Sequence, residues 1–272
     1  MFSKIINRLF PKPQSIPIAY PVGIESALKG KVALIIGGSS GIGLSIAQTF
    51  EKAGCKVIIA GSREERLIKA CEQCGEHVRY VVIDVKNVNS IANKISTAAD
   101  LYDEGKIDIL VNSFGTHHIS TFENITEEEY DSIMDVNAKG LFFTCQAFCD
   151  YLIKNKMKGH ILNISSSSAL RPAWGPYQMS KWAVNGFTKG LAKKMISHGI
   201  VVNAIAPGQT ATPMLGKNNA DDVYCDSAIS KRYLLPEEIA TWALFLASDL
   251  GNMIIGDTLY VTGGSGVITL EN

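Results

Sequence analysis

The chain has 272 residues, of which 46% are hydrophobic and 19% are charged, a composition that supplies a buried core and excludes a disordered protein or a coiled coil. Its 26 Lys and Arg residues balance 26 Asp and Glu residues, so the basic excess typical of a nucleic-acid-binding domain is absent. No apolar run approaches the roughly 20 residues of a membrane span, and we therefore expect neither nucleic acid nor a membrane as a partner.

The first 30 residues differ in character from the rest of the chain. Residues 1–12 mix apolar and basic side chains, and four prolines between positions 11 and 21 then prevent a regular helix. We expect residues 1–30 to form an N-terminal extension that packs on the surface or on a neighbouring subunit. A weak membrane or partner anchor is the alternative.

Six cysteines are spread along the chain, and its start lacks the apolar stretch of a secretory leader. These features favour reduced thiols and a cytoplasmic location. Cys71 and Cys74 have the spacing of a redox pair or half a zinc site, but no second pair completes such a site. We therefore expect no metal. Cys145 and Cys149, four residues apart in an apolar helical stretch, are expected in the core.

From Lys31 onward, segments typical of buried strands alternate with segments typical of helices. The strands are expected at Val32–Ile36, Val57–Ala60, Val78–Ile83, Ile107–Val111, His160–Ile164, Ile200–Ile205 and Thr258–Val261. The helices are expected at Ile42–Ala53, Arg63–Cys74, Ser90–Tyr102, Glu127–Asn155, Tyr177–Ser197 and Pro236–Ser248. Because nothing in this alternation marks a linker, residues 31–272 are predicted to form a single α/β domain with a doubly wound, seven-stranded parallel sheet, the Rossmann fold.

A glycine-rich segment joins the first strand to the first helix. Its residues are Gly37, Gly38, Ser39, Ser40, Gly41, Ile42 and Gly43. Glycine permits a tight turn and the close approach of a pyrophosphate, and the helix that follows presents free N–H groups to the anion. Its position between strand and helix predicts a dinucleotide site, with a tight turn that binds nothing as the alternative.

The end of the second strand indicates which dinucleotide binds. An NAD enzyme usually has a carboxylate here that holds the adenosine ribose. This chain has Ser62 and Arg63 instead, and both can donate to a 2′-phosphate. The sequence thus favours NADP over NAD, although Arg63 can equally be a solvated residue of the first helical turn.

Tyr177 and Lys181 lie one helical turn apart, so their side chains share a face. A phenol has a pKa of about 10, which a neighbouring cation lowers, and the pair therefore suits proton transfer. Tyr102 and Lys106 have the same spacing, but Gly105 interrupts them and they precede a strand at the opposite sheet edge. Only Tyr177 follows a strand that ends in serines, at positions 165–168, where a hydroxyl could donate to a substrate carbonyl.

In the order of these motifs, residues 31–266 resemble the short-chain dehydrogenase/reductase family, in particular its 3-oxoacyl-ACP-reductase-like branch. The resemblance implies that the dinucleotide is bound by the glycine-rich segment and by further residues that match family positions: Asp84, Val85, Asn112, Gly115, Tyr177, Lys181, Pro207, Gly208 and Thr212. Four positions depart from the family pattern: Ile36, Ser113, Phe114 and Thr262.

The resemblance also implies a catalytic tetrad of Asn137, Ser166, Tyr177 and Lys181. Tyr177 would exchange the proton, Ser166 would polarise the carbonyl, and Lys181 would bind the nicotinamide ribose and lower the pKa of Tyr177. Asn137 would position a proton-relaying water. The loop from Ser166 to Tyr177 is about two residues shorter than usual, so Ser165 and Ser167 stay open as alternatives.

The function implied is an NADP-dependent oxidoreductase that transfers hydride between a nicotinamide cofactor and a carbonyl or secondary alcohol, with a 3-oxoacyl compound, ketone or sugar as substrate. A dinucleotide-binding sensor or scaffold with weak catalysis is the alternative. The loops expected to contact the substrate offer Phe114, His117, His118, residues 169–174 and residues 214–232. Phe114 and Trp174 are expected in an apolar wall, and the two histidines in an ordinary polar loop. The family resemblance further implies a homo-oligomer, a tetramer or a dimer, built through the two long helices.

Overall fold

The computed structural model describes residues 26–217 and 223–268, and within them seven parallel strands form one sheet. The strands are β1 (Val32–Ile36), β2 (Lys56–Gly61), β3 (Val78–Val82), β4 (Ile109–Asn112), β5 (Gly159–Ile164), β6 (Ile200–Pro207) and β7 (Thr258–Val261). Their order across the sheet is β3-β2-β1-β4-β5-β6-β7. The predicted doubly wound parallel sheet is confirmed.

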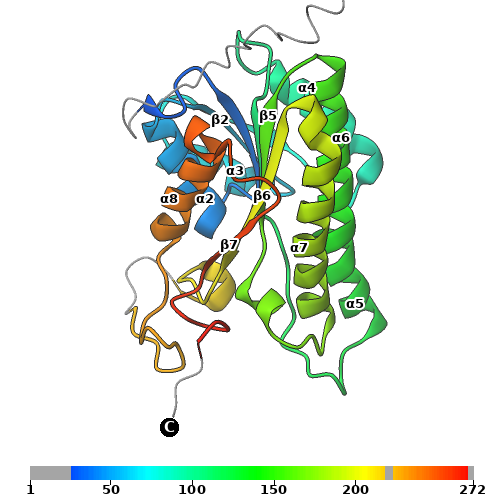
Figure 1. Ribbon diagram of the computed structural model, residues 1–272, viewed down its shortest axis with the longest axis vertical. Coiled ribbons are helices and arrows are strands. Elements are labelled where there is room, and N and C mark those ends of the chain that lie inside the picture. Colours follow the sequence, from blue (N-terminus) through cyan, green and yellow to red (C-terminus); the bar gives the residue numbers. More distant parts are fainter. Residues whose placement is uncertain (1–25, 218–222, 269–272) are drawn as a thin grey trace, which may run out of the picture.

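Helices cover both faces of the sheet (Figure 1). They are α2 (Gly41–Lys52), α3 (Glu64–Gln73), α4 (Val88–Ala99), α5 (Glu127–Met134), α6 (Leu141–Lys154), α7 (Pro176–Met195) and α8 (Pro236–Ala247). The apolar residues of α2, α3 and α8 pack on one face, and those of α4, α6 and α7 pack on the other. Each face therefore has its own hydrophobic core.

The central strands are mostly apolar because both of their faces are buried, and β1 is apolar along its whole length. In β1, Val32, Leu34 and Ile36 belong to the core beneath α4, α6 and α7, whereas Ala33 and Ile35 belong to the core beneath α2 and α8. This alternation follows from the two-residue repeat of a strand. The expected core positions of Cys145 and Cys149 are confirmed, since both pack in the first of these cores.

The strand order reverses between β1 and β4. The chain runs outward from β1 to β2 and β3, then returns to the other side of β1 and continues from β4 to β7. Loops that leave β1 and β4 therefore diverge, which opens a crevice at the carboxyl ends of these strands.

The long helix expected at Glu127–Asn155 is interrupted in the structure. After α5, residues Asp135–Gly140 form a π-helical turn, and α6 continues from Leu141. The turn buries the Asn137 side chain, which accepts a hydrogen bond from the backbone N–H of Thr116 at 2.8 Å and donates to its carbonyl oxygen at 2.9 Å. A single extra residue in a helical turn is a recurrent way to aim one side chain inward, and sequence periodicity did not predict it.

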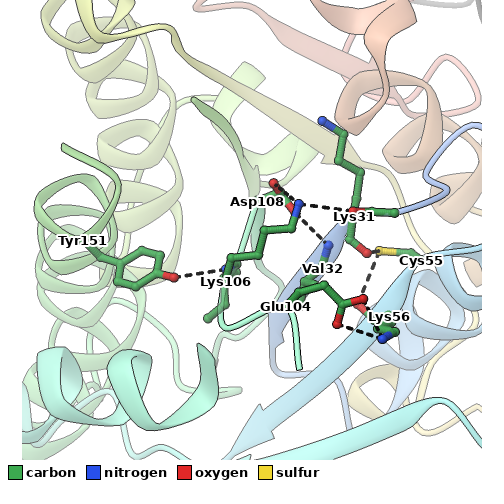
Figure 2. Close-up of polar contacts among 10 residues, drawn as sticks. Lys31, Val32, Cys55, Lys56, Glu104, Lys106, Asp108 and Tyr151 are labelled. Atoms are coloured by element: carbon green, nitrogen blue, oxygen red, sulfur yellow. Dashed lines mark hydrogen bonds and ion pairs between the residues drawn. The ribbon is translucent and has the colours of Figure 1, made fainter. Parts of the chain in front are cut away.

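The opposite, amino-terminal edge of the sheet is held by a polar network (Figure 2). Asp108, at the start of β4, accepts from the backbone N–H of Val32 at 2.9 Å and from Lys106 Nζ at 3.0 Å. The hydroxyl of Tyr102 donates to the carbonyl oxygen of Val57 at 2.9 Å. Tyr102 and Lys106 thus form their bonds at the amino-terminal edge of the sheet, away from the pocket, as their sequence context indicated.

Three further expectations concern the N-terminal extension, a metal site and a membrane span. The predicted extension lies outside the described residues except for residues 26–30, in which Leu28 is fully buried in the core beneath α2. All six cysteines are free, and among the described residues no cluster of His, Cys, Asp or Glu could hold a metal ion. None of the described helices is long and apolar enough to span a membrane.

Candidate active site

A pocket of about 590 Å³ occupies the crevice at the carboxyl ends of the strands. Its walls come from the segments that follow β1, β2, β3, β4, β5 and β6, and from Ser265 beyond β7. The switch in strand order therefore positions residues from the whole length of the domain around one cavity.

The floor of the pocket is the predicted glycine-rich segment. Gly37 has φ of +84°, and a Cβ there would lie 2.5 Å from the carbonyl oxygen of Ser113. A Cβ on Gly43 would lie 2.2 Å from the carbonyl oxygen of Gly37, so α2 can pack against the turn only through glycine. Gly43 itself lies outside the lining and shapes the turn, whereas Gly37, Ser39, Ser40, Gly41 and Ile42 line the cavity.

The amino terminus of α2 faces the pocket, and no acidic side chain of its own first turn offsets its charge. Ser40 makes no side-chain capping bond, and the first turn contains no acidic residue. The first N–H groups of a helix lack intrahelical acceptors and carry a partial positive charge. This end of the cavity is therefore suited to an anion such as a pyrophosphate.

One end of the pocket, beyond β2 and β3, carries basic side chains. Ser62 and Arg63, which the sequence indicated as donors to a 2′-phosphate, line this end together with Asp84 and Val85. The structure adds Arg66, which sequence reasoning missed, and Lys86. Arg66 follows Arg63 by three residues at the start of α3, a spacing that places two side chains on neighbouring positions of one helix face. This spacing is visible in the sequence and could have identified Arg66.

At the other end, Ser166, Tyr177 and Lys181 come together. Ser166 follows β5, and α7 presents Tyr177 and Lys181 on one face. Lys181 Nζ lies 5.8 Å from the centre of the Tyr177 ring and donates to the carbonyl oxygen of Ile164 at 3.0 Å. A hydrogen bond joins the Ser166 side chain to Tyr177. The three groups form one contiguous cluster.

Burial determines the protonation of this cluster. It lowers the pKa of Lys181 to about 8, because an ammonium is disfavoured in a dry site. It also raises the pKa of Tyr177, and the hydrogen bond from Ser166 opposes that shift only in part. The expected lowering of the Tyr177 pKa by Lys181 is therefore not found in the protein alone, where desolvation of the phenol dominates.

The geometry separates the three candidate serines. The Ser165 hydroxyl is buried and donates to the carbonyl oxygen of Lys181 at 3.3 Å. The Ser166 hydroxyl accepts from the backbone N–H of Ser168 at 3.1 Å and also bonds to Tyr177. No hydrogen bond joins Ser167 to Tyr177 in the described part of the chain. Ser166 is accordingly the serine that the fold pairs with the phenol.

Two predicted asparagines lie outside the pocket lining. Asn112 is buried between β4 and β5, where its Nδ2 donates to Asn163 Oδ1 at 2.9 Å. Asn137 donates to Ser180 Oγ at 3.1 Å, in addition to its two bonds with Thr116. The side chain of Asn137 thus holds the loop after β4 against α7. Asn112 therefore joins β4 to β5, and Asn137 positions the loop after β4, without either side chain lining the pocket.

The loops after β4, β5 and β6 form the remaining wall. Gly115 and Phe114 line the cavity, and the His117 ring centre lies 5.9 Å from that of Tyr177. Pro207, Gly208 and Thr212 also line it, and a Cβ on Gly41 would lie 3.2 Å from Thr212 Cγ2. Trp174, expected in an apolar wall, is 53% exposed and is not part of the lining.

These features fit a dinucleotide. The glycine turn leaves room for a pyrophosphate, the α2 terminus supplies N–H donors, and basic side chains lie at one end with a tyrosine and a lysine at the other. Ile36, where the family usually has threonine, is buried, and both Ile36 and Phe114 line the cavity.

Comparison with known proteins agrees with this geometry. Residues 31–223 match the family model for short chain dehydrogenase. The chain is 35% identical to a 3-oxoacyl-(acyl-carrier-protein) reductase of Thermotoga maritima, covering 87% of this chain and 98% of the relative. It is similar to the structure of a 3-ketoacyl-(acyl-carrier-protein) reductase from Brucella melitensis complexed with NADH, with a TM-score of 0.80, 31% identity, and coverage of 88% of this chain and 100% of that chain. An actinorhodin polyketide ketoreductase with NADPH gives a TM-score of 0.79 at 27% identity, covering 89% and 98% of the two chains.

Proposed function

This chain belongs to the short-chain dehydrogenase/reductase family and is of the 3-oxoacyl-(acyl-carrier-protein)-reductase-like type, and from that premise we propose that it reduces a carbonyl compound with NADPH through Tyr177. The protein is an NAD(P)-dependent oxidoreductase that transfers hydride between a nicotinamide cofactor and a small molecule. The NADP preference, the catalytic residues and the direction toward reduction belong to the proposal. The observation that carries it is the cluster of Ser166, Tyr177 and Lys181 in the pocket.

The mechanism follows from the positions and protonation of these three side chains. When bound, the dinucleotide supplies the hydride that adds to the carbonyl carbon. The raised pKa of Tyr177 keeps the phenol protonated near neutral pH, so it can donate its proton to the developing alkoxide. Ser166, bonded to Tyr177, is near enough to donate to the same oxygen and to stabilise its charge.

Lys181 and Asn137 support the proton transfer in different ways. With its pKa of about 8, Lys181 is charged at neutral pH and stabilises the phenolate left after Tyr177 gives up its proton. Nζ of Lys181 can also bind the ribose of the dinucleotide. Asn137 acts as a positioning residue, because its side chain holds the backbone of Thr116 beside the site.

The preference for NADP rests on the end of the pocket near β2. No carboxylate stands directly after β2 to repel a 2′-phosphate, and Ser62, Arg63 and Arg66 line that end. Arginine binds phosphate through its fork of N–H donors. Asp84 lies two residues beyond β3, and its Oδ1 accepts a hydrogen bond from the backbone N–H of Lys86 at 3.0 Å. Its carboxylate can also accept a hydrogen bond from the edge of the adenine ring.

The test of the reaction is Tyr177→Phe, compared with Ser166→Ala and Ser165→Ala. We expect Tyr177→Phe to abolish turnover while NADPH affinity stays within a few-fold, and Ser166→Ala to lower kcat roughly 100-fold. Ser165→Ala should cost far less, because its hydroxyl bonds to backbone. Near-normal turnover by Tyr177→Phe would refute the mechanism.

The test of the cofactor is a thermal-shift titration with NADPH and with NADH. A ligand at a hundred times its dissociation constant stabilises the folded state by about 2.7 kcal/mol, which is measurable. We expect NADPH to give the larger shift, and Arg66→Glu to reverse the preference. A larger shift with NADH in the wild-type protein would contradict the assignment of Ser62, Arg63 and Arg66. No shift with either ligand would favour a scaffold function.

The proposal extends to assembly and location. Phe142 of α6 is 43% exposed and Trp182 of α7 is 51% exposed, so an apolar face remains on the two long helices, which supports a homodimer or tetramer built there. Six free cysteines support a reducing, cytoplasmic environment. The unit proposed to act is the domain that begins near Lys31, preceded by the N-terminal extension.

A further inference from the structure

The charges around the pocket are strongly unequal. Among the described residues that line it, the basic ones are Arg63, Arg66, Lys86, Arg171 and Lys181, and Asp84 is the acidic one. Arg63, Arg66 and Lys86 lie at the end assigned to the adenosine part of the cofactor. Lys181 belongs to the proton-transfer cluster. Arg171 remains, and neither binding of the dinucleotide nor the proton transfer accounts for it.

Arg171 lies at the reacting end of the cavity. It is five residues beyond Ser166 on the loop that follows β5, with a short 3₁₀ turn, Ser167–Leu170, between them. The strands β2 and β5 are separated by β1 and β4 in the sheet. At the usual spacing of neighbouring strands this places Arg171 on the order of 14 Å from the arginines beyond β2, too far to act on the same phosphate.

The position of Arg171 is built by three neighbouring segments. Its Nη2 donates to Ser265 Oγ at 2.6 Å, and its backbone carbonyl accepts from Trp182 Nε1 of α7 at 2.9 Å. Gly266, with φ of +79°, lies against it, since a Cβ there would be 3.5 Å from Arg171 Nε. The backbone and the stem of the side chain are thus fixed from α7 and from the segment after β7.

The guanidinium itself is largely free to bind a ligand. Arginine has five N–H donors, and within residues 26–217 and 223–268 Ser265 Oγ is the one hydrogen-bond acceptor that they meet. No carboxylate in these ranges forms an ion pair with Arg171. Arginine binds carboxylate and phosphate groups through two parallel hydrogen bonds, and its charge is not lost at any working pH.

On the basis of the reaction proposed above, we propose that the substrate is an anionic carbonyl compound whose carboxylate or phosphate group binds the guanidinium of Arg171. The carbonyl would then meet Ser166 and Tyr177, and the anionic end would lie toward Ser265 at the mouth of the pocket. Small oxo acids and phosphorylated ketones share this chemistry.

The test compares charged and neutral partners of the same carbon skeleton. Acetoacetate and longer 3- and 4-oxo acids are compared with their methyl esters, and dihydroxyacetone phosphate with dihydroxyacetone, at saturating NADPH. We expect kcat/KM to be at least tenfold higher for the charged partner in one of these sets, which identifies the anionic group. Arg171→Gln should lower kcat/KM for that charged partner roughly 10- to 100-fold and for the neutral one less than threefold.

Two further variants separate binding from structure. Arg171→Lys keeps the charge without the fork and should recover part of the loss. Ser265→Ala removes the hydrogen bond from Arg171 Nη2 but keeps the guanidinium charge. The ratio of kcat/KM for the charged compound to that for its neutral counterpart should therefore change less than threefold. Equal losses on charged and neutral partners in Arg171→Gln, or no preference in the wild-type enzyme, would overturn the inference.

A binding measurement distinguishes this inference from the proposed reaction. The same acids and the phosphate are titrated onto the protein saturated with NADP⁺, where reduction cannot occur, and tryptophan fluorescence reports binding beside Trp182. Binding that weakens at least tenfold in Arg171→Gln supports the inference even if no compound is reduced, a result that would refute the reaction alone. Unchanged binding in Arg171→Gln overturns the inference even if the reaction is confirmed.

Discussion

Single residues in the pocket show how burial shifts the protonation of ordinary side chains. Tyr177 and Lys181 have shifts of opposite direction, because burial disfavours the charged form of each: the pKa of the phenol is raised and that of the ammonium is lowered. The Ser166 hydrogen bond favours the phenolate. Near neutral pH the phenol of Tyr177 is therefore protonated, and Lys181 is charged beside it.

These shifts predict the pH dependence of carbonyl reduction. Lys181 is charged below its pKa of about 8 and neutral above it, whereas Tyr177 keeps its proton beyond the ordinary phenol pKa. We expect kcat/KM to be constant below pH 7 and to fall about tenfold per unit well above pH 8, as the cation is lost. In Lys181→Arg, whose side chain stays charged, the decline should move above pH 9. A wild-type profile that stays flat to pH 9.5 would contradict the assignment to Lys181.

At the scale of elements, one edge of the sheet forms the pocket and the other edge stabilises the strands. The carboxyl edge carries the pocket, where the β1–α2 turn and the loops after β4 and β5 meet. The amino edge carries the network of Asp108, Lys106 and the backbone of Val32, which joins the starts of β1 and β4 (Figure 2). Residues at the amino edge stabilise the strands that position the site without touching it.

This division predicts a loss of stability without a loss of activity. Asp108→Ala leaves the buried N–H of Val32 without its partner, which should cost about 1–3 kcal/mol of unfolding free energy. For a domain of this size the melting temperature should fall by roughly 2–12 °C, measured by calorimetry. kcat/KM at 25 °C should stay within twofold.

A matched control lies in the same network. Glu104→Gln removes the surface ion pair with Lys56, whose 2.6 Å contact is solvent-exposed and should contribute little. A melting temperature that falls as far in Glu104→Gln as in Asp108→Ala would show that the buried bond to Val32 is not the source of the effect.

The helices also show where periodicity fails. Hydrophobic spacing predicted one helix over Glu127–Asn155, whereas the structure has a π-helical turn at Asp135–Gly140 between α5 and α6. The turn at Asp135–Gly140 exists because Asn137 bonds to the Thr116 backbone and to Ser180. These partners are 21 and 43 residues away in the sequence, so no local window contains the cause.

At the scale of the whole molecule, the long helices α6 and α7 retain an apolar outer face. Phe142 of α6 packs its ring 5.2 Å from that of Phe187 of α7, and both Phe142 and the α7 residue Trp182 are exposed. Gly186 lies on the same helix, and a Cβ there would meet nothing within 4 Å. The single protomer therefore has room for a side chain at Gly186. If the proposed assembly packs a second subunit on α7, that room would be lost.

A charge at Gly186 therefore tests the proposed assembly. Gly186→Glu should leave the protomer folded, since glutamate is a better helix former than glycine, and should convert the oligomer to a smaller species by light scattering. The shift in melting temperature with NADPH reports whether the protomer stays folded. A wild-type protein that is monomeric, or an oligomer that Gly186→Glu leaves intact, would contradict assembly through α6 and α7.

The sequence by itself determined the sheet and its parallel direction, and it predicted a site at the carboxyl ends of the strands. Apolar runs, a glycine turn between strand and helix, and a tyrosine four residues before a lysine are local patterns, and local patterns can be read without coordinates. It also determined the family, and it singled out Gly37, Gly41, Ser62 and Arg63, which line the pocket in the structure.

Only the tertiary structure decided what depends on residues far apart in the chain. It paired Ser166 rather than Ser165 with Tyr177, and it removed the side chains of Asn112 and Asn137 from the pocket lining. It also brought Arg66 and Arg171 to opposite ends of one cavity and left the Arg171 guanidinium without a carboxylate partner in the described part of the chain. Burial, hydrogen-bond partners and pKa shifts are sums over neighbours that the fold assembles, and the sequence does not state which neighbours those are.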